Sequence, residues 1–329
     1  MAGSLPENGE AQLGPVRLPA GRRVIPPEHG QPVAWVTRRM VPDPGLIWSA
    51  LTDVHGETGL IPVVVNDDAD GDDDLFTDPC DVAEIDRLNA AELLAARWQG
   101  HVGDDDEDDE GPGFPGTPRV TEYLGLKQPG EGGNSIFDIV TAVIGAVHDP
   151  EADAELTRLS ELDRQSPEWQ EWAERSGARE AGRAEIAFPG LAPATEGSLS
   201  GAARTAALRS LRPARICLAA ANRPADALAG FGWTCFDDPA YDDGIRNAVW
   251  IGAVLRSWEN RFGARLLAIG PGAQIQLLVS RPPRTLEAAE KVAAEHSAFC
   301  DECAGTGRRT VREIAPVLVD APIWTFWWD

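Results

Sequence analysis

The chain has 329 residues, of which 43% are hydrophobic and 25% charged, the composition of an ordinary globular protein. Its formal net charge is −24 and no basic stripe could neutralise phosphates, so nucleic-acid binding is not expected. A polar N-terminus, no apolar run long enough to cross a bilayer, and an odd number of five cysteines predict a soluble, cytoplasmic protein with reduced thiols and no membrane contact.

The negative charge is concentrated in one part of the sequence. Residues 66–110 hold 18 acidic and 2 basic residues, whereas residues 212–329 hold 14 acidic and 13 basic residues. Most of the excess lies in two tracts, "NDDADGDDD" and "DDDEDDE". The charge therefore describes a local feature and not the whole surface.

The sequence pattern of residues 16–103 predicts an N-terminal α/β region in which the first acidic tract forms a loop. "PVAWVT" and "GLIPVVV" predict strands, the second one covered on both faces, and a helix with Asp43 as its cap is expected between them. A further helix is expected over "DVAEIDRLNAAELLAARW". Residues 104–118 then predict an acidic linker rich in proline and glycine, 119–187 a helical segment, and 188–211 a connection.

Residues 212–329 predict an α+β module that folds by itself. Its elements, in order, are a strand over "ARICLAAA", a helix that ends at Gly263, a hairpin, a helix capped by Thr285, a helix with Pro316 inside it, and a final strand. The expected fold class is α+β, or α/β, with mixed sheets flanked by helices. Two stretches, Trp48 to Val65 and Trp258 to Ile269, share a tryptophan helix, a glycine and an apolar strand, either as a weak repeat or by coincidence.

The last residues, "IWTFWWD", are rich in aromatic side chains. In a strand, Trp324, Phe326 and Trp328 point to one face and Ile323, Thr325 and Trp327 to the other, so both faces are bulky and mostly apolar. A platform for stacking nucleic-acid bases would need interleaved basic residues, and none is present. We expect a central strand with both faces buried, although a ligand-facing aromatic platform is the alternative.

This ending, together with "RSWENRFGA" and "AFCDE", resembles a family of bacterial proteins whose C-terminal module is domain of unknown function 4253. The shared signature comprises Trp258, Glu259, Arg261, Gly263, Trp324, Phe326, Trp327 and Trp328. The N-terminal stretches "LPAGRRV" and "LIWSALTDVHGETGLIPVVV" and the later "FPGLAPA" are similar to longer members of this family. The resemblance implies no activity.

The first acidic tract is the strongest candidate for a metal site. Asp68, Asp70, Asp72 and Asp74 alternate as the ligands of a calcium loop do, with a glycine at the turn. However, Thr77 stands where a glutamate should close the site. A solvated acidic loop is the alternative interpretation.

A second candidate is the group His296, Cys300 and Cys303, whose spacing is compatible with zinc. A fourth ligand would have to come from elsewhere, for example from Cys235. His296 also shares a helix face with Ala289 and Ala293, where it would pack as a core residue. No cofactor is therefore predicted outright.

Two polar residues are weak candidates for catalysis. His55 has acidic neighbours in "DVHGETG" but no nucleophile in sequence reach. Glu259 with Asn260 could border a pocket, although two exposed polar residues near a helix end are commonplace. We expect a protein-binding or regulatory protein, such as an inhibitor or immunity factor, whose acidic tracts engage a partner that is basic. The alternative is a hydrolase or metal-dependent enzyme with a site between the two halves.

Overall fold

The structure is a computed structural model that describes residues 3–26, 29–66, 76, 78–98, 118–125, 150–171, 187–233, 247–270, 274–300 and 311–328. The chain divides into two compact units. The first combines residues 1–103 with 186–329, and the second consists of residues 104–185.

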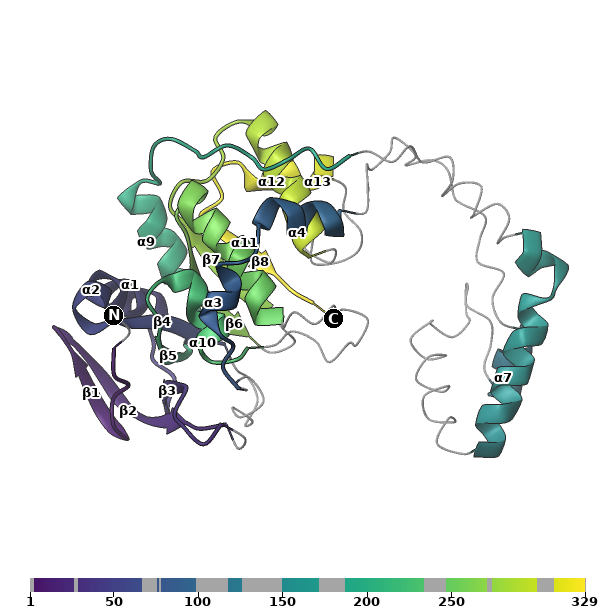
Figure 1. The fold of residues 1–329 in the computed structure, drawn as a ribbon, viewed down its shortest axis with the longest axis horizontal. Helices are drawn as coiled ribbons and strands as arrows, with labels where there is room; N and C mark the ends of the chain where they lie inside the picture. Colours follow the sequence, from purple (N-terminus) through teal and green to yellow (C-terminus); the bar gives the residue numbers. More distant parts are fainter. Residues whose placement is uncertain are drawn as a thin grey trace. The chain divides into compact units, whose positions relative to one another are not determined.

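The first unit is built on one mixed sheet of eight described strands, in the order β1-β2-β3-β5-β4-β6-β7-β8 (Figure 1). All neighbours are antiparallel except β4 and β6, which run parallel. The strands are β1 (Gly9–Leu13), β2 (Val16–Val24), β3 (Ala34–Thr37), β4 (Leu60–Val65), β5 (Arg215–Ala220), β6 (Ala264–Gly270), β7 (Gln274–Val279) and β8 (Ile323–Phe326). The expected α+β class with a mixed sheet is confirmed.

Helices flank this sheet. They are α1 (Pro44–Asp53), α2 (His55–Thr58), α3 (Val82–Ile85), α4 (Ala90–Arg97), α9 (Gly201–Arg209), the 3-10 turn η2 (Pro224–Asp226), α10 (Ala227–Gly230), α11 (Asn247–Phe262), α12 (Leu286–Phe299) and α13 (Val311–Leu318). The helix expected over residues 81–98 is two short helices, with Asp81 and Asn89 capping them. Asp43 precedes α1, as expected, but its side chain makes no capping hydrogen bond.

Both faces of the sheet are buried, each in its own core. Along β4, Ile61, Val63 and Val65 belong to one core, while Leu60 and Val64 belong to the other. This alternation follows from the two-residue period of a strand, and it confirms that β4 is covered on both sides. The larger core contains α11, α12 and the terminal aromatics; the smaller one contains Trp48 and Leu51 of α1.

The strands of the N-terminal and C-terminal regions interleave. β5 comes from the C-terminal region, yet it pairs with β3 on one side and β4 on the other. β4, in turn, pairs with β6. The sequence boundary at residue 212 therefore falls inside one sheet and does not separate two hydrophobic cores.

A hairpin of β1 and β2 extends the sheet and was not predicted from the sequence. Its residues mix apolar and polar side chains and include Pro19 and Gly21, which weaken the strand pattern. Gly21 is required here because a Cβ at this position would lie 2.3 Å from Cζ2 of Trp35. The need for glycine at this position comes from a contact with a neighbouring strand, so the local sequence could not predict the hairpin.

The terminal strand β8 corrects one prediction. It lies at the end of the described sheet and pairs only with β7 there, so it is not a central strand. Trp324, Phe326 and Trp328 are buried, as expected for a core face. Trp327 is only half-buried, because its face of the strand has no layer of comparable depth over it.

The possible repeat has a structural counterpart. Gly59 and Gly263 are both left-handed, with φ of 64° and 59°, and each donates its N–H to the carbonyl four residues earlier. The strands that follow them, β4 and β6, pair in parallel with Val64 opposite Ala268. Each of these two residues lies five positions after its glycine, so the two helix–glycine–strand stretches stand side by side in matching register.

The second unit contains α5 (Pro118–Tyr123) and α7 (Pro150–Arg164), which contact each other. The buried carboxylate of Asp163 accepts hydrogen bonds from the backbone N–H and the guanidinium of Arg119. The carboxylate of Asp163, at the N-terminus of α5, thus joins the two helices.

Candidate functional site

A small pocket opens where β4 and β6 separate. Their parallel ladder includes Val64 and Val65 but not the preceding residues of β4. Pro62 lies in this unpaired part and has no N–H to donate to β6. Strand β6 also carries a bulge between Leu266 and Ala268. Proline and bulge together leave a gap between two otherwise adjacent strands.

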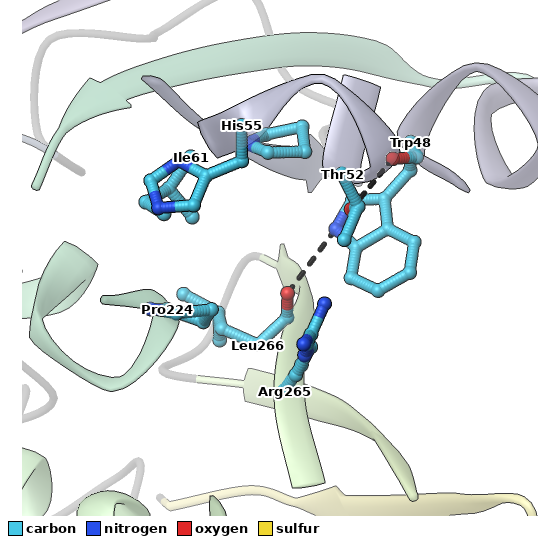
Figure 2. A pocket seen from close by; sticks show the side chains of 8 residues that line it. Trp48, Thr52, His55, Ile61, Pro224, Arg265 and Leu266 are labelled. Carbon is cyan, nitrogen blue, oxygen red and sulfur yellow. Dashed lines mark hydrogen bonds between the residues drawn. The ribbon is translucent and has the colours of Figure 1, made fainter. Parts of the chain in front are cut away.

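Trp48 of α1 reaches into this gap. Its indole Nε1 donates a hydrogen bond of 3.2 Å to the carbonyl oxygen of Leu266, the position that pairs with Pro62 if the register of the ladder is extended (Figure 2). Since Pro62 cannot serve as donor, the indole satisfies a carbonyl that the sheet leaves open. Trp48 is almost completely buried, so this bond also anchors α1 to the C-terminal strand β6.

The pocket has a volume of about 50 Å³. If one water molecule occupies about 10–15 Å³ by the same measure, the pocket has room for about three to five water molecules. It is lined by Trp48, Thr52, His55, Ile61, Pro62, Pro224, Arg265 and Leu266.

His55 presents one ring nitrogen for binding. Its Nδ1 lies 3.1 Å from the carbonyl oxygen of Leu60, an acceptor, so Nδ1 carries the proton of the neutral ring. Nε2 is then the acceptor nitrogen. On the preceding helix α1, the Thr52 hydroxyl donates to the carbonyl oxygen of Trp48, and its own lone pairs can still accept hydrogen bonds (Figure 2).

Arg265 of β6 supplies a positive charge. It lies on the strand between two residues of the larger core, so its side chain points to the opposite face, toward the α1 side. Among the described residues, no carboxylate lies within ion-pair distance of it. Sequence analysis did not single out Arg265 or Thr52; Pro62 within a strand was the available signal, because it predicts a missing ladder bond.

Glu259, the second catalytic candidate, does not line this pocket. Its carboxylate pairs with Arg223 at 2.8 Å, and Arg223 also donates to the side chain of Asn260. Arg223 immediately precedes Pro224 of the pocket wall. His55 and Glu259 therefore belong to neighbouring but distinct sets of contacts.

The zinc candidate is not assembled in the described part of the chain. The imidazole of His296 is buried among Trp258, Trp324 and Phe326, with ring centroids 4.6–5.2 Å away. Burial lowers the pKa of His296 from 6.5 to about 3. Cys300 is also buried and its thiol donates to the carbonyl of Trp327.

Cys303 and Cys235 lie outside the described residues, as do Asp68, Asp70, Asp72, Asp74 and Thr77 of the calcium candidate. Within the described ranges no three His, Cys, Asp or Glu side chains gather around a common point that could hold a metal ion. The calcium site remains a sequence-based prediction. For His296, the interpretation as a core residue agrees with its environment.

The signature tryptophan and arginine converge on a carboxylate that sequence analysis missed. Glu295 of α12 is fully buried and accepts hydrogen bonds from Nε1 of Trp258 at 2.7 Å and from both terminal nitrogens of Arg261 at 2.6 and 2.7 Å. The backbone N–H of Ala192 completes the set. Glu295 thereby ties α11, α12 and the connection before α9 together, and its signal was an acidic residue on an apolar helix face.

Three further signature residues, Trp324, Phe326 and Trp328, pack with Trp258 in the aromatic core. Trp258 stacks on Phe326 with ring centroids 5.2 Å apart, and it meets Trp324 edge-on at 5.5 Å. Phe326 also stacks loosely on Trp328. The terminal aromatics therefore build the interior of the fold, and the buried rings do not form a ligand platform.

Comparison with known proteins finds one match, to a family model that covers the C-terminal region. No helix among the described residues is long and apolar enough to cross a membrane. No curated protein and no solved structure matches the chain. Residues 215–329 match the family model of the domain of unknown function DUF4253, which confirms the resemblance expected from the C-terminal signature.

Proposed function

We propose that this protein is a cytosolic binding or regulatory protein whose acidic segment, residues 66–110, engages a basic protein partner. The observation that carries the proposal is the segregation of charge in the sequence. The two tracts at 66–74 and 104–110 hold 13 acidic residues and no basic one. Such a concentration steers association with an oppositely charged surface and sets its salt dependence.

The ion pairs of the folded unit support this proposal. Four arginines of the C-terminal region already have carboxylate partners: Arg223 with Glu259, Arg256 with Asp226 and Asp86, Arg261 with Glu295, and Arg284 with Asp320. These four arginine side chains form ion pairs within the folded unit. Among these carboxylates only Asp86 belongs to residues 66–110, so the partners of these four arginines come mainly from outside the acidic segment.

The test compares three full-length proteins in affinity capture from extract of the native host. One is the unmodified chain, and one has the 13 tract acids changed to Asn or Gln. The control removes seven charges, about half as many, by changing exposed acids elsewhere to Gln: Glu57, Glu122, Glu161, Glu168, Glu196, Glu287 and Glu290.

We expect the unmodified chain and the control to retain the same basic protein at low salt, and the tract variant to lose it. Calorimetry with the purified partner should then show an affinity that falls steeply with ionic strength. If the tract variant retains the same partner with the same affinity, the proposal is wrong.

The enzyme alternative has one observation in its favour, the placement of His55 in a pocket lined by residues of both sequence regions. Among the described residues this pocket holds one imidazole and one hydroxyl, and Glu259 is paired outside it. These groups are sufficient to bind a small ligand, whereas a hydrolase site would need further catalytic residues.

A further inference from the structure

We propose that the pocket between β4 and β6 binds a small carboxylate that also carries a hydroxyl group, that is, a short hydroxy acid. This proposal is independent of the acidic segment, because none of the residues that line the pocket lies within residues 66–110. The groups that could recognise a ligand are the guanidinium of Arg265, the hydroxyl of Thr52 and the imidazole of His55 (Figure 2).

The charge of the ligand follows from Arg265. A guanidinium presents a planar fork of donors that matches a carboxylate, and it contributes no acceptor. Within the described residues this fork has no carboxylate of the protein to bind. An anionic ligand would complete it, whereas a cationic ligand would be repelled.

The hydroxyl of the ligand follows from His55 and Thr52. The Nδ1 proton of His55 is used by the carbonyl of Leu60, which leaves Nε2 as an acceptor. The Thr52 hydroxyl gives its proton to the carbonyl of Trp48 and likewise keeps acceptor capacity. Two acceptors in a pocket that is also lined by a cation therefore favour a ligand that has a donor in addition to its carboxylate.

The size of the ligand follows from the walls. Ile61, Pro62, Pro224 and Leu266 are apolar, and the volume of about 50 Å³ excludes a large molecule. The body between carboxylate and hydroxyl must therefore be short, as in a two- or three-carbon hydroxy acid. Pro62 and the bulge of β6 keep the gap open by preventing the ladder from closing over it.

The test uses ligand-observed NMR on the full chain with glycolate, acetate, ethylene glycol and inorganic phosphate as probes. We expect glycolate to bind, acetate to bind at least threefold more weakly, and neutral ethylene glycol to give no signal. The threefold difference corresponds to the loss of one ordinary hydrogen bond, about 0.5–1.5 kcal/mol.

Variants locate the binding. Arg265→Gln should weaken glycolate at least tenfold, whereas the matched control Arg39→Gln, an exposed arginine outside the pocket, should bind as the unmodified chain does. His55→Phe should reduce the preference for glycolate over acetate, with acetate affinity retained. All variants are checked for an unchanged circular dichroism spectrum and melting temperature.

Three outcomes would overturn the proposal. The first is no glycolate binding by the unmodified chain, and the second is equal binding by Arg265→Gln and Arg39→Gln. The third is binding of inorganic phosphate with no binding of glycolate, which would assign the pocket to a tetrahedral anion. None of these outcomes bears on the acidic segment, so the two proposals fail separately.

Discussion

The two helix–glycine–strand stretches of this chain have the same backbone plan and opposite surroundings. In the first, α1 and α2 lead through Gly59 into β4; in the second, α11 leads through Gly263 into β6. Trp48 belongs to the smaller core and donates its N–H to a backbone carbonyl, whereas Trp258 belongs to the larger core and donates to a carboxylate.

The difference shows that the same helix–glycine–strand arrangement can border a pocket in one place and form a closed core in another. Beside Trp48 the interior is incomplete, with a gap at Pro62 and a small pocket. Around Trp258 every direction is closed by aromatic rings, by His296 and by the Arg261–Glu295 pair. We therefore expect changes at the second stretch to affect stability most, and changes at the first to affect binding.

The largest effect is expected from Glu295→Ala. This change leaves the partly buried guanidinium of Arg261, the indole N–H of Trp258 and the N–H of Ala192 without their acceptor. Removing one partner of a buried pair typically costs about 3–5 kcal/mol. Urea unfolding should show this loss, and Glu287→Ala, exposed on the same helix, should change stability by less than about 0.5 kcal/mol. Equal stability of the two variants would contradict the role of Glu295.

The two tryptophans can be compared directly by replacing each with phenylalanine. Trp258→Phe removes one of the donors to a fully buried carboxylate, and hydrogen bonds to charged groups are worth about 1.5–3 kcal/mol. Trp48→Phe frees a carbonyl beside the pocket, where water can replace the indole, so we expect a loss of about 1 kcal/mol. Urea unfolding of both variants measures the difference, and a larger loss for Trp48→Phe would reverse the assignment.

His296 predicts a specific dependence of stability on pH. Its pKa is about 3 in the folded protein and 6.5 as the ordinary value, so the folded state excludes the charged form. The stabilisation is complete above pH 6.5 and is lost as the pH falls from 6.5 toward 3, by about 2 kcal/mol at pH 5.

The variant His296→Phe should lose this contribution to the slope of the unfolding free energy between pH 7 and pH 5. Replacement of the exposed His29 by glutamine provides the control and should retain it. If His296→Phe and the unmodified chain show the same slope, the imidazole is not buried as a neutral group.

A further moderate effect concerns the two glycines. Gly59→Ala and Gly263→Ala each force a side chain into the left-handed region, which costs about 1–2 kcal/mol. Gly263→Ala should cost somewhat more, because the new Cβ would lie 3.1 Å from Cβ of Ser280. Thermal unfolding of both variants checks this, and a stable Gly59→Ala variant would argue that the two stretches are not equivalent.

Much of the C-terminal region could be predicted from sequence because its signals are local. The end of α11 at Gly263, the cap at Thr285, the hairpin and the terminal strand all depend on residues within a few positions of one another. The burial of Trp324 and Phe326 followed from the alternation of a strand.

The remainder depends on partners far apart in the chain. Nothing near residues 215–220 indicates that β5 lies between β3 and β4, or that β8 is at an edge. Glu295 is one of three glutamates in its helix, and only the position of Arg261, 34 residues earlier, distinguishes it. The pocket needs Pro62 and Arg265 together, which no single window of sequence contains.

The central claim is that both ends of the chain form one sheet, and fragments test it most directly. Residues 205–329 lack β3 and β4, which flank β5 and border β6. We therefore expect this fragment alone to show no cooperative unfolding transition in urea, and the transition to appear when residues 1–103 are added in trans. A cooperative transition of the fragment alone, unchanged by the added segment, would contradict the claim and restore a self-folding C-terminal module.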